Sequence, residues 1–420
     1  MLKFLHAADI HLDSALRGLE RYEGAPVEDI RGATRRAFDN LVELAIEEEV
    51  DFLLLVGDLY DGDWKDYNTG LFFVQRMGRL RDAGIRVFLV AGNHDAASQI
   101  TRHLRLPDNV KTFSTREPEQ FVLDDLGVAI YGQGFATRAV TEDISLAYPQ
   151  GDPQFFNIGL LHTCLDGKKG HDPYAPCTLD GLRSKGYQYW ALGHVHQREE
   201  VCRDPWIVFP GNIQGRHIRE TGPKGCTLVV VDNGVVQDVV HRDLDVLRWS
   251  LCEVDIAGLD TIDDIYERVR DELQAVLDAA DGRAVAARLV LQGTCPIHSR
   301  LLASMTHYTQ EFRALATALG GAGLWLEKVL VNTRPSVTAD DILAQDDAFG
   351  GLLRSIQALE LDDAASATLA EELTALRQKL PAEMLEGNDA YDPTDGGQLD
   401  RALEDIKELL MHRLLVSDRK

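Results

Sequence analysis

The chain has 420 residues, of which 45% are hydrophobic, 26% charged and 7% aromatic. This composition is typical of globular proteins and excludes a disordered or fibrous chain, and the length predicts two or three domains. The formal net charge of −25 argues against tight, unaided, non-specific binding to nucleic acid, which usually requires a basic surface. The charge does not exclude nucleic acid as a substrate, because a metal centre or a partner can supply positive charge.

The sequence carries no pattern typical of a membrane span or a secretion signal. No stretch reaches the roughly 18–20 consecutive apolar residues of a transmembrane helix. The opening residues MLKFLHAAD are typical of a strand and lack the apolar run and cleavage site of a signal peptide. The six cysteines are dispersed, with no C-x-x-C pair. We therefore expect a protein of the reducing cytoplasm.

Residues 1–243 alternate short apolar runs with segments of helical periodicity, which predicts an α/β layered fold. Helices are expected over 31–49 and 69–83. Asp232-Asn233-Gly234 separates two apolar runs and predicts a hairpin turn. The strands expected in this region are 3–8, 52–56, 87–91, 157–161 and 189–192.

Residues 244–335 form a second predicted unit. Its pattern gives a strand, an acidic helix, a strand, a helix and a strand, which is the order of a small α/β domain. The expected elements are a strand at 249–256, a helix at 261–279, a strand at 286–292, a helix at 299–319 and a strand at 324–331.

Residues 336–420 differ in composition, since they hold 19 acidic and 8 basic side chains. A linker is expected at 387–397, where glycine, aspartate and proline accumulate. After it, Leu399, Leu403, Ile406, Leu410 and Leu414 recur at helical spacing. Two interpretations stay open: a helix packed on its own chain, or a tethered helix that docks on a partner.

Short polar motifs follow the apolar runs of residues 1–243. In α/β sheets, sites form outside the carboxyl ends of the strands, and each motif falls at such a position. One such motif alone is typical of an ordinary turn, but their repeated placement after strands favours one common site. The motifs are Asp9-Ile10-His11, Gly57-Asp58-Leu59-Tyr60-Asp61, Gly92-Asn93-His94-Asp95, Gly159-Leu160-Leu161-His162 and Gly193-His194-Val195-His196.

The residue types in these motifs suit divalent metals. Imidazole and carboxylate are ligands of Mn, Fe and Zn, and the lack of thiolate disfavours a structural zinc site. In D-x-H and H-x-H, alternation along an extended strand end points both side chains the same way. Asp58 has two oxygens that can bridge two cations, and Asn93 offers a neutral oxygen. Two cations roughly 3.5–4 Å apart can clamp a phosphoryl group and activate water.

Together the motifs resemble the calcineurin-like metallophosphoesterase family across residues 1–243. The N-terminal D-x-H, the small second domain and the C-terminal region resemble its SbcD-type DNA-repair nuclease branch, and within it the bacterial YhaO-type exonucleases. The resemblance implies a four-layer β-sandwich flanked by helices, a small α/β cap domain that contacts DNA, and a helical C-terminal region. Further segments similar to the YhaO type are 12–19, 171–176 and 210–217.

The resemblance also implies the two ligand sets of the metal centre. The first cation would be held by Asp9, His11, Asp58 and His196. The second would be held by Asp58, Asn93, His162 and His194. Two divalent ions are implied, with Mn²⁺ expected and Fe, Zn or Mg as alternatives.

By the same resemblance, His94 contacts the scissile phosphate and stabilises or protonates the leaving oxygen, with Asp95 expected to orient it. Asp61 departs from nuclease members that carry a second histidine there. Arg216 and His217 are expected either to contact phosphate or to belong to an ordinary solvated loop. Residues 168, 169 and 171 are expected on the substrate side.

The implied function is a DNA nuclease with 3′-to-5′ exonuclease and endonuclease activity. The resemblance also implies a homodimer formed through the catalytic domain, and pairing with an SMC-like coiled-coil ATPase through residues 336–420. One alternative is a phosphodiesterase or phosphatase acting on a small or non-DNA phosphoester, which the acidic composition favours. The other is a non-catalytic subunit, which a missing ligand would favour; no ligand of the two implied sets is missing.

Overall fold

A computed structural model describes residues 1–14, 32–61, 67–97, 105–165, 174–336, 348–360, 362–380 and 392–417. Most of segment 12–19, part of segment 171–176, and positions 168, 169 and 171 lie outside these residues. Two compact units are distinguished. The first comprises residues 1–252, 272–289 and 315–328, and the second comprises 253–271, 290–314 and 329–420.

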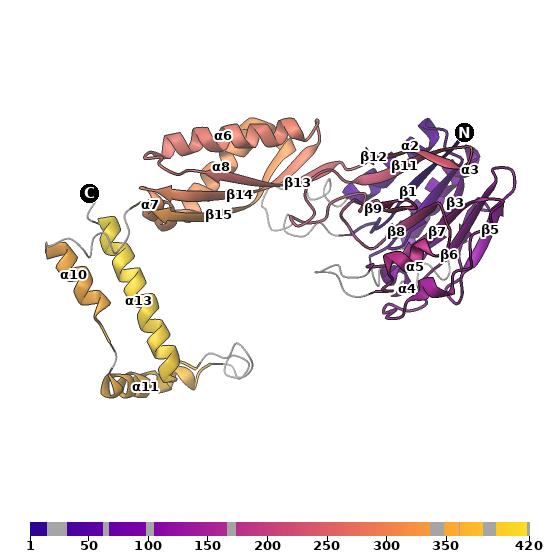
Figure 1. Cartoon of the computed structure of the whole chain (residues 1–420). Coiled ribbons are helices and arrows are strands. Elements are labelled where there is room, and N and C mark those ends of the chain that lie inside the picture. The colour runs from indigo at the N-terminus through magenta and orange to yellow at the C-terminus, as the bar shows by residue number, and fades with distance from the viewer. Residues whose placement is uncertain are drawn as a thin grey trace. The chain divides into compact units, whose positions relative to one another are not determined.

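The first unit contains two six-stranded sheets (Figure 1). In the first sheet, β1 to β4 run parallel, and the hairpin of β11 and β12 is added antiparallel to β1. Asn233 and Gly234 both have positive φ in the turn of that hairpin, as its Asn-Gly signal predicts. The sheet order is β12 (Val235–Asp243), β11 (Gly225–Asp232), β1 (Leu2–Ala7), β2 (Phe52–Val56), β3 (Arg86–Val90) and β4 (Val110–Thr112).

The second sheet has a parallel centre and antiparallel edges. Strands β6, β7, β8 and β10 are parallel, while β5 and β9 pair antiparallel at the two edges. Its order is β5 (Glu119–Leu123), β6 (Val128–Gln133), β7 (Phe156–His162), β8 (Tyr189–Gly193), β10 (Trp206–Phe209) and β9 (Glu199–Arg203).

Alternation along the strands builds four layers. On β1, Phe4 joins the apolar core between the sheets, whereas Leu5 faces the helices α2 (Ala33–Glu47) and α3 (Tyr67–Asp82). The outer face of the second sheet is covered around Trp190 by residues of η1 (Ile144–Ala147) and α5 (Leu179–Arg183). The expected four-layer sandwich flanked by helices is therefore confirmed.

Gly159 of β7 packs so closely against aromatic rings that only glycine fits there. A Cβ atom there would lie 2.4 Å from ring carbons of Trp190, which stacks on Tyr187 at a centroid distance of 4.8 Å. We expect Gly159→Ala to lower the free energy of unfolding by about 1–3 kcal/mol, because overpacking forces the buried rings to shift. Urea unfolding measures this change.

Gly78 of α3 provides the matched control, because a Cβ there meets nothing within 4 Å. Gly78→Ala should stabilise the protein by roughly 0.5–1 kcal/mol, since alanine has the higher helix propensity. Equal unfolding midpoints for the two variants would contradict the packing argument.

A three-stranded sheet follows, in the order β13 (Leu247–Asp255), β14 (Ala284–Cys295) and β15 (Leu324–Pro335). Helix α6 (Ile262–Ala279) connects the first two strands, as expected. The single helix expected at 299–319 is instead two helices, α7 (His298–Ala303) and α8 (Met305–Gly320), interrupted at Ser304 and followed by η2 (Gly321–Gly323).

The C-terminal region contains α10 (Ala348–Gln357), α11 (Asp363–Arg377) and α13 (Gly396–Ser417). Helix α13 contacts α7, α10 and α11, and its Leu399 is buried. Ile406 and Leu409 on the same helix are about half exposed, at 50% and 52%. Helix α13 thus packs on its own chain and also presents apolar side chains to solvent. In the part of the chain that the structure describes, no helix has the length and apolar character of a membrane span.

Candidate metal centre

The predicted motifs follow parallel neighbouring strands within each of the two sheets, and the two sets of motifs meet at one edge of the sandwich. Asp9 and Asp58 follow β1 and β2, which pair in register in the first sheet. His162 ends β7 and is the register partner of Gly193, the residue before His194. Asn93 and His94 open the short helix α4 (Asn93–Ala97) that follows β3.

Several of these residues occupy strained backbone conformations. The φ angles of Asp9, His11, Asp58 and His194 are 51°, 46°, 51° and 102°, in the region that non-glycine residues rarely adopt. Loop hydrogen bonds maintain these conformations, including His194 N donating to Asp9 Oδ2 at 2.9 Å. Such strain persists only where surrounding structure enforces it, and it gathers at functional sites.

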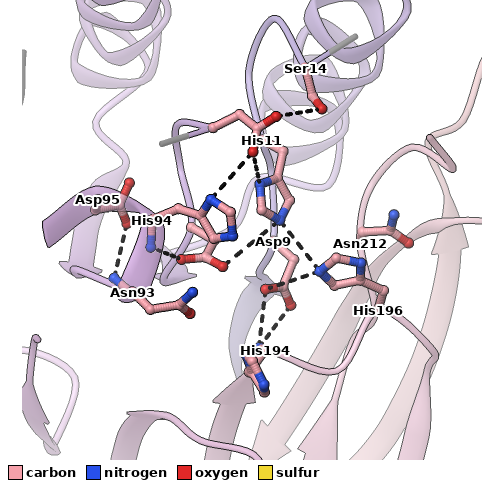
Figure 2. A network of polar contacts seen from close by, with 12 residues as sticks. Asp9, His11, Ser14, Asn93, His94, Asp95, His194, His196 and Asn212 are labelled. Carbon is pink, nitrogen blue, oxygen red and sulfur yellow. Dashed lines mark hydrogen bonds and ion pairs between the residues drawn. The ribbon is translucent and has the colours of Figure 1, made fainter. Parts of the chain in front are cut away.

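Asp9, His11 and His196 form a first group of candidate ligands. One donor atom from each lies within 4.8 Å of the others. The Nε2 atoms of His11 and His196 are 3.4 Å apart, and His196 Nε2 is 3.9 Å from Asp9 Oδ1. Figure 2 shows the two rings converging with Asp9 from separate loops. These residues belong to the set that the family resemblance implies for the first cation.

Asp58, His162 and His194 form a second group, whose donor atoms also lie within 4.8 Å of one another. His162 Nε2 lies 3.5 Å from Asp58 Oδ2 and 3.0 Å from Asn93 Oδ1. Asp58 Oδ2 is also 3.8 Å from His11 Nε2, so its carboxylate faces both groups. The structure therefore places Asp58 where the sequence predicts a bridging ligand.

The electrostatics of these groups fit divalent cations. Burial, and secondarily the charge of Asp58, raises the pKa of Asp9, and burial also raises the pKa of Asp58. Burial lowers the pKa of His162 to about 3 and places that of His11 well below its usual value. Neutral imidazoles beside two buried carboxylates present lone pairs and negative charge, which a divalent cation satisfies.

Metal binding should stabilise the protein measurably. We expect Mn²⁺ at a hundred times its dissociation constant to raise the free energy of unfolding by about 2.7 kcal/mol for each bound ion. Thermal melts of chelator-treated protein with and without Mn²⁺ measure the effect, and excess chelator should reverse it. Identical melting temperatures would contradict a metal centre.

His94 forms a third group of candidate ligands with His11 and Asp58, and it is more open to solvent than they are. Its side chain is 28% exposed, and its Nδ1 is 3.3 Å from Asp61 Oδ1. The hydrogen bond that His94 donates to Asp61 raises the pKa of His94, while the pKa of Asp61 is held well below its usual range by His11 and His94. Ser14 Oγ donates to Asp61 Oδ2 at 2.9 Å and fixes the carboxylate.

Asp95 does not take the place expected of it. Its buried carboxylate accepts hydrogen bonds from Gly92 N at 2.9 Å and Tyr60 N at 3.1 Å, so it ties two loops together. Burial, followed by the charge of Asp58, raises the pKa of Asp95 to about 7. Adjacent residues of a helix point in different directions, so the carboxylate beside His94 is Asp61 rather than Asp95.

The loop between β10 and β11 brings Arg216 and His217 to the edge of the site. Arg216 Nη1 is 3.9 Å from Asp61 Oδ1, and its Nη2 is 3.3 Å from His196 Nδ1. Glu220 in the same loop accepts from His196 Nδ1 at 2.7 Å. Sequence reasoning missed Glu220, whose only signal is an acidic side chain close after a basic cluster.

Comparisons with known proteins agree with this geometry. A calcineurin-like phosphoesterase family model matches residues 2–198, and a model of the middle domain of metallophosphoesterase YhaO matches residues 249–334. The chain belongs to the calcineurin-like metallophosphoesterase family, and it is a metal-dependent phosphoester hydrolase.

Among its relatives is the uncharacterized metallophosphoesterase YhaO of Bacillus subtilis (strain 168). It is 38% identical over 299 residues, which cover 70% of this chain and 72% of the relative.

Two solved structures show a weaker likeness. A dimetal phosphatase from Danio rerio has a TM-score of 0.34 and 13% identity, covering 55% of this chain and 93% of that one. The protein TT1561 of Thermus thermophilus has a TM-score of 0.32 and 12% identity, covering 56% of this chain and 97% of that one. The family assignment depends on the sequence matches.

Proposed function

We propose that this metallophosphoesterase is a Mn²⁺-dependent DNA nuclease of the SbcD type, with 3′-to-5′ exonuclease and endonuclease activity. The proposal depends mainly on three candidate ligand groups that overlap at His11 and Asp58, the third of which includes the more open His94. Such a site suits hydrolysis of a phosphodiester, and the additional α/β domain favours a polymer as substrate.

In the proposed reaction, one cation would be held by Asp9, His11, Asp58 and His196, and the other by Asp58, Asn93, His162 and His194. When bound, the cations polarise the phosphoryl group and lower the pKa of a water molecule. Water attacks phosphorus in line and loses a proton to solvent, the bond to the leaving oxygen breaks, and His94 Nε2 gives that oxygen a proton. Asp61 holds the imidazole through Nδ1, and Arg216 contributes positive charge beside the phosphate.

The proposal includes a partner, an SMC-like coiled-coil ATPase docked on the C-terminal region, and a homodimer formed through the catalytic domain, both in the cytoplasm. The exposed Ile406 and Leu409 of α13 support docking through helix α13. The acidic charge of residues 336–420 suits a basic surface on the ATPase. Deleting these residues should abolish co-purification with the ATPase. ATPase binding by the shortened chain would contradict the docking site.

A second candidate is a phosphodiesterase or phosphatase for a small or non-DNA phosphoester. The net charge of −25 favours it, because a strongly acidic protein repels a polyanion.

The experiment that separates the candidates compares end-labelled single-stranded and duplex DNA with bis(p-nitrophenyl) phosphate, all with Mn²⁺. The wild-type protein is tested beside His94→Ala. DNA degradation by the wild type alone supports the nuclease, and the product ladder gives its polarity. Hydrolysis of the small diester without DNA cleavage, also in the presence of the ATPase, would favour the second candidate.

A further inference from the structure

Glu220 lies behind His196, away from the candidate ligand atoms, and neither the motifs nor the family matches include it. It is buried, with 6% of its surface exposed, in the loop between β10 and β11. Its Oε1 accepts from His196 Nδ1 at 2.7 Å, and its Oε2 accepts from Asn212 Nδ2 at 2.9 Å and from Arg216 N at 2.7 Å. Both carboxylate oxygens of Glu220 therefore accept hydrogen bonds, one from His196 and the other from two donors of its own loop.

The contact with Glu220 decides which nitrogen of His196 carries the proton. A carboxylate only accepts, so the 2.7 Å contact places the proton on Nδ1. The guanidinium of Arg216 is farther from Nδ1, at 3.3 Å, and lies 3.5 Å from Glu220 Oε1, so the carboxylate engages both neighbours. Nε2 of His196 is left with a lone pair toward Asp9 and His11.

The loop that carries Glu220 is fixed by packing and hydrogen bonds. Trp249 of β13 is fully buried and donates through Nε1 to Gly215 O at 3.0 Å. Gln214 donates to Leu247 O at 2.7 Å and accepts from Val246 N at 3.0 Å. Glu220 thus acts on His196 from a rigid support anchored at the first strand of the small sheet.

We infer that Glu220 is a positioning residue of the metal centre, which fixes the tautomer and ring orientation of His196 so that Nε2 meets the cation. The inference rests on the two-metal centre of the proposed function and is independent of the substrate. Residues behind a metal-bound histidine typically change metal affinity about 10–100-fold when they are removed.

The test is calorimetric titration of chelator-treated, full-length protein with Mn²⁺. In Glu220→Ala, we expect the dissociation constant of one of the two bound ions to rise about 10–100-fold, while the other changes little. Glu220→Gln should fall between wild type and Glu220→Ala, because one amide oxygen cannot serve donors on both sides of the side chain.

Glu327→Ala is the matched control. Glu327 is a partly buried carboxylate, paired with Arg288 at 2.8 Å in the small sheet, and its loss should leave Mn²⁺ binding unchanged. Metal-free thermal melts check folding, and if Glu220→Ala does not fold, Glu220→Gln decides the question. Unchanged Mn²⁺ binding in a folded Glu220 variant would overturn this inference alone. A wild-type protein without Mn²⁺ binding would overturn the centre itself.

Discussion

Replacing His94 by alanine is expected to lower kcat for phosphodiester hydrolysis about 10²–10⁴-fold, while Mn²⁺ binding stays within a few-fold of wild type. The loss corresponds to about 2.7–5.4 kcal/mol of transition-state stabilisation. His94 is paired with Asp61 at 3.3 Å, and its raised pKa favours the protonated form that can give a proton to the leaving oxygen. Of the three candidate ligand groups, those formed by Asp9, His11 and His196 and by Asp58, His162 and His194 keep all their donors without His94.

Steady-state kinetics and Mn²⁺ titration of the same His94→Ala preparation check this result. Asp61→Asn should lower kcat less, about 10–100-fold, because the imidazole remains but loses its carboxylate. Loss of metal binding together with turnover would assign His94 to the ligands instead. Unchanged turnover would remove His94 from the reaction, and hydrolysis lost with metals retained excludes a non-catalytic subunit.

Replacing Asp58 by asparagine is expected to abolish binding of at least one Mn²⁺ ion and to reduce hydrolysis at least as strongly as His94→Ala. Asp58 Oδ2 lies 3.8 Å from His11 Nε2 and 3.5 Å from His162 Nε2, so its loss affects both ligand groups. Removing this buried charge beside Asp9 should also stabilise the metal-free protein by about 0.5–2 kcal/mol, a gain in stability at the expense of function.

Metal content after dialysis against Mn²⁺, together with metal-free urea unfolding, measures both effects of Asp58→Asn. Asp125→Asn is the control, since it removes an exposed carboxylate paired with Arg86 outside the site. Full metal occupancy in Asp58→Asn would contradict the bridging position. A less stable metal-free variant would contradict the unfavourable burial of charge.

The meeting of the motifs could be predicted because it follows from topology. Parallel strands end at the same edge of a sheet, so the polar residues after 157–161 and 189–192 were expected to meet. That Asp58, which follows 52–56 in the other sheet, joins them required the structure. Period-two spacing predicted Asp9 beside His11 correctly. It was wrong for His194 and His196, because the backbone turns at His194 and the two histidines join different ligand groups. Which oxygen and nitrogen atoms face one another required the structure, because the loops turn through positive φ at Asp9 and Asp58.

The partners behind the site could not be predicted. Asp95 adjoins His94 in sequence, yet α4 directs its carboxylate to backbone amides, and Asp61 from the loop after β2 stands beside the imidazole. Glu220 reaches His196 across 24 residues from a loop whose conformation depends on packing around Trp249. Such contacts depend on long-range packing and leave no periodic signal.

Some edge strands and one helix interruption were not predicted either, because they too depend on tertiary packing. The edge strand β9 has a partly exposed sequence without an apolar run, and β4 spans only Val110–Thr112. The interruption at Ser304 occurs inside a continuous helical pattern, where tertiary packing overrides propensity. Strands β1, β2, β3, β7 and β8 were predicted from their apolar runs, whereas β6 and β10, which also lie inside the second sheet, were not.

The decisive measurement is a Mn²⁺ titration of chelator-treated, full-length protein during hydrolysis of bis(p-nitrophenyl) phosphate. A two-metal phosphoesterase predicts no turnover without metal and a rise that saturates at two equivalents per chain, with the same preparation of His94→Ala binding Mn²⁺ but remaining inactive. Turnover in excess chelator, or full metal binding without hydrolysis of this diester or of DNA, would contradict it.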